Sequence, residues 1–385
     1  MTSLAILTPF FLYFLYIYLK DRSLVSLSFV YAAPFFILNI LFFSLSFSVY
    51  DLDFSLDHFI IILIYFLSFV LFSFGLRCGA YKSATLKLYN IRKNSKISFL
   101  ILITYLLVFY WIYLYSDFLP NFRLTYELSR HDGNAFIWFV TFVMINLSVV
   151  SSIFFYNGIG RIIHLTFLSL GYIVIGTKFG VIFLGISVLT YSVLFFGFKL
   201  TFSRNFFLIL FICITPFLLF YYFHVPSFEM ILPYLIGYTD YTFNASSLLS
   251  IDPYWGQINF ENNLYSRIPR FIFPSKPFFF GDYRLVNDLS LTHNNTGFPS
   301  FGYWGSLIAD FGYFSIFIIS FISFFKGFFI SYLLKGSLIL HSFVKYVLVL
   351  ILLGYPLVSL GSTHLIVETI LLSFLLAYKF KLKSI

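Results

Sequence analysis

Long apolar runs alternate with short polar connections along most of the chain. Eleven of these runs approach or exceed the ~20 residues that a membrane-spanning helix needs. They are residues 4–19, 25–49, 58–76, 97–115, 135–156, 162–176, 179–198, 206–223, 304–325, 343–361 and 365–378. Because backbone groups in lipid must be hydrogen-bonded within their own segment, each run is predicted to be an α-helix. The pattern therefore predicts an all-α polytopic membrane protein with about 11 transmembrane helices.

The composition agrees with this fold class. Hydrophobic residues make up 60% of the 385 residues and charged residues only 10%, whereas a soluble domain has about 25% charged residues. The polar surface is too small to cover a soluble globule, and the low charge excludes intrinsic disorder. Two cysteines, Cys78 and Cys213, are too few for a disulfide framework. The first apolar run lacks a basic leader, so we expect it to remain as a membrane helix.

The distribution of basic residues orients the predicted helices. Residues 77–96 contain six basic side chains and no acid, which indicates a cytoplasmic segment under the positive-inside rule. Alternation from this segment places the N-terminus outside and the C-terminus inside. The net charge of +9 then reflects membrane topology, and nucleic acid is not an expected partner.

Two external segments are longer than simple turns, residues 116–134 and residues 224–303. Connections beyond ~15 residues are uncommon without a function. The predicted organisation is therefore residues 1–223 with helices 1–8, a large external loop at 224–303, and residues 304–385 with helices 9–11. The first part of the large loop, residues 224–250, is semi-apolar and broken by prolines, which is compatible with a helix lying in the membrane interface.

Basic residues gather in the second half of this loop. Arg267, Arg270, Lys276 and Arg284 fall within 18 residues, and three prolines lie between them. The prolines stiffen the backbone and disfavour a helix. Arginine presents a planar fork that suits phosphate oxygens, so this segment is a candidate anion site. Alternatively, these side chains pair with acids of the loop or with lipid headgroups.

A glycine-containing stretch follows, led by His293. Glycines permit tight turns and close approach of the backbone. Asp310 lies just inside the ninth predicted span, where an acid is costly unless it is paired or faces water. We therefore expect Asp310 to bind substrate or, alternatively, to cap or orient the loop.

This region resembles the Wzy-type O-antigen polymerase family, which polymerises the oligosaccharide repeat units of bacterial surface polysaccharides. The residues that carry the resemblance are Arg267-Ile268-Pro269-Arg270, Pro274-Ser275-Lys276-Pro277, Thr296-Gly297-Phe298-Pro299-Ser300, Gly305 and Asp310-Phe311-Gly312. The many spans and the single large loop in the C-terminal half match the family architecture, and the motifs cover about 50 residues. Two positions depart from the family pattern. Lys178 ends a small-residue turn where members often have arginine, and Ser315 replaces a frequent glycine.

The resemblance implies a metal-independent membrane glycosyltransferase in the bacterial inner membrane, without a cofactor and with its active site facing the periplasm. The implied donor is a glycan on undecaprenyl diphosphate, and the implied acceptor is a single lipid-linked repeat unit. A sugar hydroxyl of the acceptor attacks the anomeric carbon of the donor, and polyprenyl diphosphate leaves. A chain-length regulator protein is an implied partner, in addition to membrane lipid.

This reaction requires cations at the leaving diphosphate and a base for the hydroxyl proton. Arg267 and Arg270 are the first candidates for the cations. Further candidates for binding the diphosphate or the glycan are Arg123, Arg130, Lys178, Lys276, Arg284 and Asp310. His293 is the candidate base because imidazole titrates near neutral pH. The alternative bases are Glu261, Asp282 and Asp288, which the sequence does not rank.

Other chemistries find less support in the sequence. No His or Cys spacing resembles a metal site, and no P-loop, dinucleotide fingerprint or nucleophile elbow occurs. An O-antigen ligase is the nearest rival function, because it shares the fold type and the donor and differs in its acceptor, the lipid A core. A lipid-linked oligosaccharide flippase would need short loops and ionisable residues inside its spans. A membrane acyltransferase would place a histidine-centred site near the cytoplasmic face.

Overall fold

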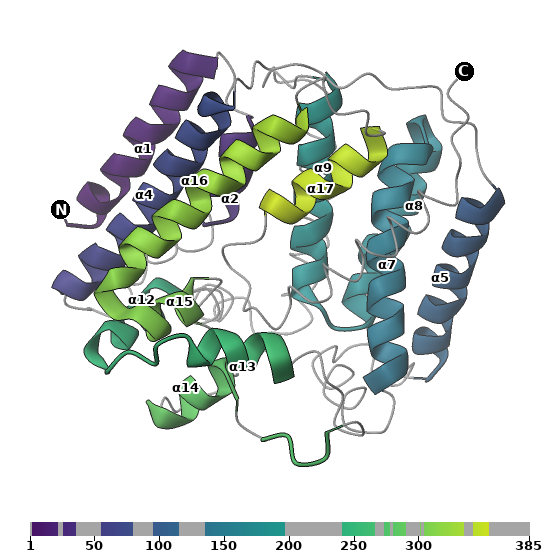
Figure 1. The fold of residues 1–385 in the computed structure, drawn as a ribbon. Helices are drawn as coiled ribbons and strands as arrows, with labels where there is room; N and C mark the ends of the chain where they lie inside the picture. Colours follow the sequence, from purple (N-terminus) through teal and green to yellow (C-terminus); the bar gives the residue numbers. More distant parts are fainter. Residues whose placement is uncertain are drawn as a thin grey trace. The chain divides into compact units, whose positions relative to one another are not determined.

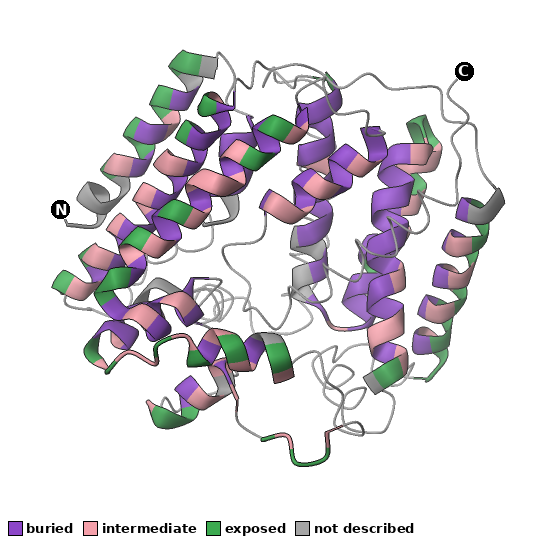
Figure 2. Ribbon diagram, in the orientation of Figure 1, coloured by how far each residue is buried: buried purple, intermediate pink, exposed green. Residues whose placement is uncertain are grey.

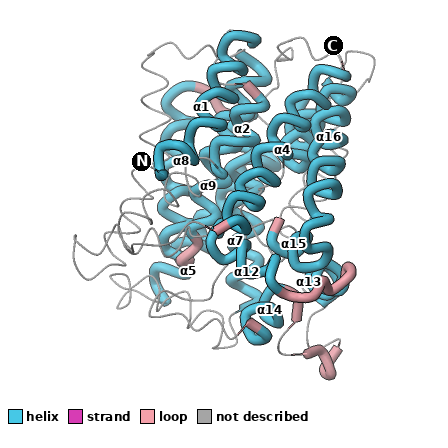
Figure 3. Tube along the Cα trace, turned by 90° about the vertical axis from the view of Figure 1, so that its left-hand side faces the viewer, coloured by secondary structure: helices cyan, strands magenta, loops and turns pink. Residues whose placement is uncertain are grey.

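The computed structural model describes residues 2–21, 26–35, 55–79, 95–114, 135–196, 241–265, 273–277, 280–289, 301, 304–334 and 342–353. All regular elements within these ranges are helices (Figure 3). The chain divides into two compact units. The first comprises Met1–Ser83, Leu232–Leu338 and Ile351–Val367, and the second comprises Ala84–Ile231, Ile339–Leu350 and Glu368–Ile385.

The helices of the two units are labelled in Figure 1. The first unit contains α1 (Thr2–Asp21), α2 (Leu27–Phe35), α4 (Leu56–Cys78), α12 (Tyr241–Ser247), η4 (Leu248–Ser250), α13 (Gln257–Tyr265), α14 (Asp282–Asp288), α15 (Gly305–Phe311), η5 (Gly312–Phe314) and α16 (Ser315–Leu334). The second unit contains α5 (Ser95–Leu114), α7 (Ala135–Phe155), α8 (Gly158–Val174), α9 (Lys178–Phe196) and most of α17 (Ser342–Leu353).

Several of these helices match the predicted membrane spans. Within the described ranges, four segments are long and apolar enough to cross a membrane: Leu56–Cys78, Ile97–Leu114, Phe136–Phe155 and Gly305–Leu334. Four shorter apolar segments are Thr8–Ile17, Gly158–Val174, Phe183–Phe196 and Ser342–Leu353. The protein is therefore an all-helical, multi-pass membrane protein over the part of the chain that the structure describes. The predicted spans at 206–223 and 365–378 lie outside it, so the count of eleven stays a prediction.

The predicted span at 304–325 is divided into two helices. Gly312 ends α15 with φ +51° and ψ −132°, a conformation that residues other than glycine rarely adopt. Helix α16 then begins at Ser315 and continues to Leu334, so the predicted end at residue 325 is too early. Lys326 lies within α16, and its ammonium group is 5.4 Å from the centroid of the Trp304 ring.

Helices α4 and α16 lie side by side and run in the same direction (Figure 1). At their first turns, the Tyr313 hydroxyl just before α16 donates a hydrogen bond to Asp57 of α4 at 2.9 Å. Near their other ends, Gly79 follows α4 and lies against Ser331 of α16. A common direction for these two spans is also what the alternating topology predicts. The side of the membrane that each end faces stays a prediction.

Glycines bring the backbones of these two helices into direct contact. A Cβ atom at Gly75 would lie 2.1 Å from the carbonyl oxygen of Phe324, and one at Gly327 would lie 2.1 Å from the carbonyl oxygen of Phe72. No side chain fits at either position. Close packing of small residues is a common way for membrane helices to associate, because burying apolar surface provides little driving force in lipid.

The outer surface of α16 differs from its packed face. Exposed and buried positions alternate along the helix in Figure 2, and its exposed side chains include Phe317, Phe321 and Phe329. Exposed phenylalanines are expected on a helix surface that faces lipid.

The polar helices α13 and α14 gather with the short helix α15 beyond the starting ends of α4 and α16 (Figures 1 and 3). Helices α13 and α14 come from the predicted external loop, and α15 connects that loop to α16. The structure thus gives part of this loop a helical fold. Residues 223 and 303, at the predicted domain boundaries, lie outside the described ranges.

Candidate functional site

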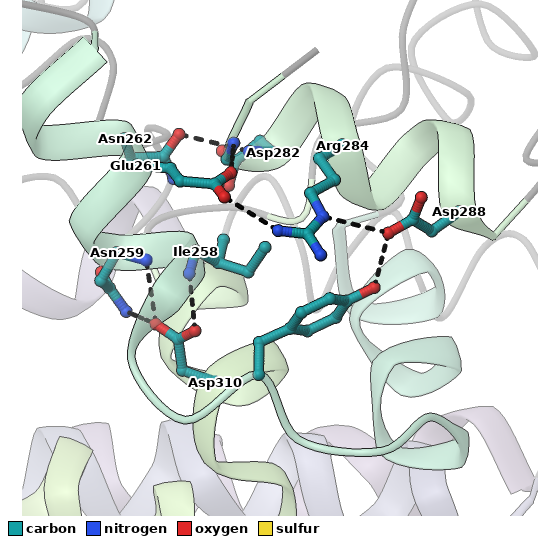
Figure 4. A network of polar contacts seen from close by, with 10 residues as sticks. Ile258, Asn259, Glu261, Asn262, Asp282, Arg284, Asp288 and Asp310 are labelled. Atoms are coloured by element: carbon teal, nitrogen blue, oxygen red, sulfur yellow. Dashed lines mark hydrogen bonds and ion pairs between the residues drawn. The ribbon is translucent and has the colours of Figure 1, made fainter. Parts of the chain in front are cut away.

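Asp310 is fully buried and binds the first turn of α13. Its Oδ1 accepts a hydrogen bond from the Ile258 N–H at 2.8 Å, and its Oδ2 accepts from the Asn259 N–H at 2.9 Å and from Asn259 Nδ2 at 2.6 Å (Figure 4). A carboxylate at this place satisfies N–H groups that have no partner within the helix and interacts favourably with the helix dipole. This geometry supports the alternative in which Asp310 orients the loop.

The turn before α13 is held by the same part of α15. The Tyr254 N–H donates to the Ala309 carbonyl at 3.1 Å, and the Trp255 N–H donates to the Asp310 carbonyl at 2.8 Å. The turn closes through a hydrogen bond of 3.2 Å from the Gln257 N–H to the Tyr254 carbonyl. Its two central residues have positive φ, +50° at Trp255 and +92° at Gly256. Positive φ at both positions is typical of a type I′ turn.

Arg284 of α14 pairs with Glu261 of α13 and with Asp288 of its own helix. Its Nη1 lies 2.8 Å from Glu261 Oε1, and its Nε lies 3.4 Å from Asp288 Oδ2. Burial acts to lower the pKa of Arg284, but the hydrogen bond and the charges of these two acids outweigh it and raise the pKa above its ordinary value. A diphosphate that binds Arg284 would therefore compete with two carboxylates that already neutralise the positive charge of the guanidinium group.

Tyr254 completes this network on the side of the turn. Its hydroxyl donates a hydrogen bond to Asp288 Oδ2 at 2.8 Å, and its ring centroid lies 5.1 Å from the guanidinium carbon of Arg284. Burial, together with the Asp288 carboxylate, raises the pKa of Tyr254 to about 12. The hydroxyl therefore stays protonated at neutral pH and remains a donor.

The start of α14 is bound by two side chains of α13. The Gly281 N–H donates to Glu261 Oε2 at 2.8 Å. Asp282 and Asn262 exchange two hydrogen bonds, one from Asn262 Nδ2 to Asp282 Oδ1 at 2.9 Å and one from the Asp282 N–H to Asn262 Oδ1 at 3.2 Å. Gly281 has φ +55°, and a Cβ there would lie 1.9 Å from Asn262 Oδ1. Only glycine fits this position.

Asp282 is the acid of this region with a strongly perturbed carboxyl group. The residue is partly exposed, but its Oδ2 atom is buried and has no hydrogen-bond partner in the described part of the chain. Burial raises the pKa of Asp282 to about 6, and the nearby charge of Asp310 adds to this effect. Because Glu261 and Asp288 are both ion-paired with Arg284, the geometry favours Asp282 among the three alternative bases.

Lys276 lies beside a cluster of three aromatic rings, which we call the aromatic cluster. The rings of Tyr265 and Phe273 stack, and the Phe280 ring meets Tyr265 edge-on with centroids 5.6 Å apart. The Lys276 ammonium lies 4.6 Å from the Phe280 centroid, within the range of a cation–π interaction. The cluster joins the end of α13 to the proline-bounded residues 273–277.

The three predicted catalytic residues, His293, Arg267 and Arg270, lie outside the described residues, as do Arg123 and Arg130, which were predicted to bind the diphosphate or the glycan. Their roles stay predictions. In sequence, Arg267 and Arg270 fall between Tyr265 and Phe273. The described residues on the two sides of the segment that carries both arginines, Tyr265 and Phe273, therefore both belong to the aromatic cluster.

Lys178 is the first residue of α9 and belongs to the second unit. Before it, α8 ends in a Schellman motif: the Thr177 N–H donates to the Tyr172 carbonyl, and the Gly176 N–H donates to the Ile173 carbonyl, both at 2.9 Å. Gly176 has φ +70°, as this motif requires. The small-residue turn expected before Lys178 is therefore present, whereas substrate binding by Lys178 stays a prediction.

The sequence interpretation missed the residues that organise this site. Asn259 and Asn262 bind carboxylates through side-chain amides, and an asparagine within a polar helix carries no pattern that distinguishes it. The Trp255-Gly256 pair was also missed, although glycine after a proline-containing stretch is a turn signal. In the part of the chain that the structure describes, no three His, Cys, Asp or Glu side chains form a group that could hold a metal ion.

Part of the chain is similar to proteins named O-antigen polymerase from Salmonella typhimurium (strain LT2) and from Salmonella typhi. Each is 32% identical over 145 residues, which are 37% of this chain and 35% of the relative. The matched region thus covers about a third of the length of these curated relatives. No protein-family model matches the chain, and no solved structure matches it. The resemblance noted in the sequence is confirmed as a distant similarity to proteins of this name.

Proposed function

We propose that the protein polymerises lipid-linked O-antigen repeat units at the periplasmic face of the bacterial inner membrane. It transfers the growing glycan from undecaprenyl diphosphate to a sugar hydroxyl of a new repeat unit. The observation that carries this proposal is the similarity to two proteins named O-antigen polymerase. The apolar spans and the polar helices at one end of α4 and α16 support it.

Cationic side chains stabilise the leaving diphosphate in this proposal, and no metal ion is required. Arg267 and Arg270 are the principal donors, because they lie in a segment whose flanking residues are fixed by the aromatic cluster. Lys276 adds a positive charge beside the same cluster. Removing one preorganised donor at a developing negative charge typically costs ~10²-fold in rate. Arg123, Arg130 and Lys178 contribute to binding the diphosphate or the glycan.

The acceptor hydroxyl transfers its proton to His293 or to Asp282. Imidazole is a general base that functions near neutral pH. The Asp282 carboxyl group, with its pKa of about 6, is largely deprotonated at neutral pH and can accept a proton there. Arg284 and Asp310 act indirectly, because their contacts hold α13, α14 and the preceding turn in place. Proposed partners are undecaprenyl-diphosphate-linked oligosaccharides, membrane lipid and a chain-length regulator protein.

The test is a lipopolysaccharide gel of the host with the gene deleted and then restored. A ladder that collapses to core plus a single repeat unit, and returns on restoration, supports polymerisation as the missing step. Loss of every repeat-bearing band would contradict the proposal. Lipid-linked polymer accumulating on the outer face would then indicate a ligase, and its absence would indicate a flippase.

The arginines are tested in the same host. Arg267→Ala and Arg270→Ala are each expected to abolish the ladder, with membrane abundance measured by an epitope tag. Two variants of normal abundance and normal chain length would contradict their catalytic assignment.

A further inference from the structure

Trp255 is exposed although it occupies a conformation that tryptophan rarely adopts. Its φ is +50°, in the left-handed region where a bulky residue is an outlier. The side chain is 73% exposed, whereas Trp111, Trp138 and Trp304 are all buried. The other three tryptophans of the chain thus contribute to the core, and Trp255 does not.

The fold holds this residue firmly in its unfavourable conformation. Backbone hydrogen bonds from the turn to the carbonyl groups of Ala309 and Asp310 hold the turn against α15. The Asp310 side chain also binds the start of α13. Glycine would adopt this φ without strain. An exposed tryptophan at such a position gains little from packing, because its ring meets no other ring in the described structure. Strained residues held by surrounding contacts are concentrated at binding and catalytic sites.

Polar groups lie on both sides of this indole in the chain. Asp252 and Gln257 are exposed, and the Tyr254 side chain leads to the network of Asp288 and Arg284. An aromatic face accompanied by carboxylate and amide groups suits a pyranose ring. The face of the aromatic ring is electron-rich and attracts the slightly positive C–H groups of the sugar, and the polar side chains can bond its hydroxyl groups.

We propose that Trp255 is a stacking platform for a sugar ring of the glycan, with Asp252 and Gln257 as hydrogen-bonding partners of that ring. The inference rests on the proposed function and specifies how the glycan, as opposed to the diphosphate, is held. A tryptophan that merely anchors the loop in the membrane interface needs no fixed orientation. It would therefore not need a positive φ, and the neighbouring Asp252 carboxylate would oppose contact with lipid.

Tryptophan fluorescence tests the platform directly. In the purified protein in lipid nanodiscs, iodide should quench mainly Trp255, because the other three tryptophans are buried. The probe is O-polysaccharide released from the host's own lipopolysaccharide by mild acid. It is expected to protect Trp255 from iodide. Unchanged quenching in the presence of the polysaccharide would overturn the proposal, as would quenching by brominated lipids in place of iodide.

Variants distinguish the loss of the Trp255 ring from a loss of protein stability. Trp255→Gly relieves the backbone strain, so it should melt no lower than the wild type and yet shorten the lipopolysaccharide ladder. We expect roughly 3- to 10-fold slower polymerisation, the usual range for one aromatic contact, and partial recovery in Trp255→Phe. Phe260→Ala removes another exposed ring, 62% exposed on α13, and should leave the ladder unchanged.

Failure of this inference differs from failure of the proposed function. If the restored wild-type gene produces a full ladder and Trp255→Gly produces the same ladder, the platform is wrong and polymerisation stands. If the wild-type gene restores no ladder, the proposed function fails first. A ladder shortened equally by Trp255→Gly and Phe260→Ala would also overturn the platform, because the effect would not be specific to this ring.

Discussion

The rings of Tyr265 and Phe273 stack with centroids 6.1 Å apart and planes inclined by 18°. Tyr265 is the last residue of α13, and Phe273 precedes the proline-bounded turn. Between them in sequence lie Arg267 and Arg270, so the stack joins the two ends of the segment that carries the proposed catalytic cations. Closing a loop has an entropic cost, and here a pair of aromatic rings offsets part of it before substrate binds.

Removing either ring is expected to impair polymerisation. Tyr265→Ala and Phe273→Ala each lose an aromatic pair, which contributes about 0.5–1.5 kcal/mol beyond the area that it buries. We expect up to about a tenfold fall in polymerisation rate, read as a shift of the lipopolysaccharide ladder to shorter chains. Tyr265→Phe keeps the ring and serves as the control. Full-length ladders from both alanine variants would show that the stack does not position the arginines.

Asp310 is expected to be a major determinant of stability. Asp310→Ala removes three charge-assisted hydrogen bonds and leaves buried N–H groups of α13 unsatisfied, which we expect to cost about 3 kcal/mol. The measurement is the thermal unfolding midpoint of the protein in detergent. Asp252→Ala removes an exposed carboxylate of the same loop and should leave the midpoint unchanged. Equal midpoints for wild type and Asp310→Ala would contradict the capping role.

Arg284 and Glu261 are expected to behave as one unit. Since their ion pair is partly exposed, Arg284→Gln and Glu261→Gln should each lower stability by only about 1 kcal/mol and should shorten the ladder to the same extent. The comparison uses the gel and the unfolding midpoint of each variant. If Arg284→Gln abolishes the polymer while Glu261→Gln does not, Arg284 binds the diphosphate, as the sequence alone suggested.

The apolar runs made the helices predictable, but the breaks within these runs could not be predicted. The run at 58–76 corresponds to α4 at Leu56–Cys78, since continuous apolar sequence permits no other structure in lipid. The break at Gly312 was missed, because a single glycine within an apolar run is compatible with a continuous helix. The positive φ of Gly312 occurs beside Pro253, whose Cγ would lie 3.4 Å from a Cβ at this position, and a contact so distant in sequence leaves no local pattern.

The site was predictable only where a residue is costly in its own surroundings. Asp310 was identified because a carboxylate near an apolar span needs a partner. Its partners were not identified. Two of its three hydrogen-bond donors are the backbone N–H groups of Ile258 and Asn259, about 50 residues away in sequence. Backbone donors have no signature in the amino-acid sequence. The ion pairs of Arg284 were left as an open alternative for a similar reason, because either an acid or a phosphate fits its fork.

The contact between α4 and α16 predicts strong sensitivity at two glycines. Gly75→Leu and Gly327→Leu each insert a side chain where even a Cβ would lie 2.1 Å from a carbonyl oxygen, so the helices must separate. We expect a loss of more than about 3 kcal/mol and low protein abundance in membranes, measured by tag detection and by unfolding in detergent. Gly160→Leu is the control, because the nearest atom to a Cβ there is 3.9 Å away. Normal abundance of both variants would contradict the close packing.

Asp282 predicts a pH dependence of stability whose sign follows from its raised pKa. The folded protein binds the Asp282 proton with a pKa of about 6, against 3.8 for the ordinary carboxyl group. The folded state is therefore favoured by protonation, and this contribution is lost as pH rises from about 4 to about 6. At neutral pH the buried charge costs at most about 3 kcal/mol. Asp282→Asn should thus be more stable than the wild type at pH 7.5 and similar to it at pH 4.5.

Unfolding in detergent between pH 4.5 and 8 tests this sign, with Asp288→Asn as the control because the Asp288 side chain is exposed and paired. Parallel pH curves for wild type and Asp282→Asn would contradict the raised pKa. The same variant also tests the base. If Asp282 accepts the acceptor proton, polymerisation in isolated membranes falls by ~10²-fold or more in Asp282→Asn, despite its higher stability. Full activity in a stabilised Asp282→Asn would leave His293 as the remaining candidate, because a carboxamide cannot accept the proton.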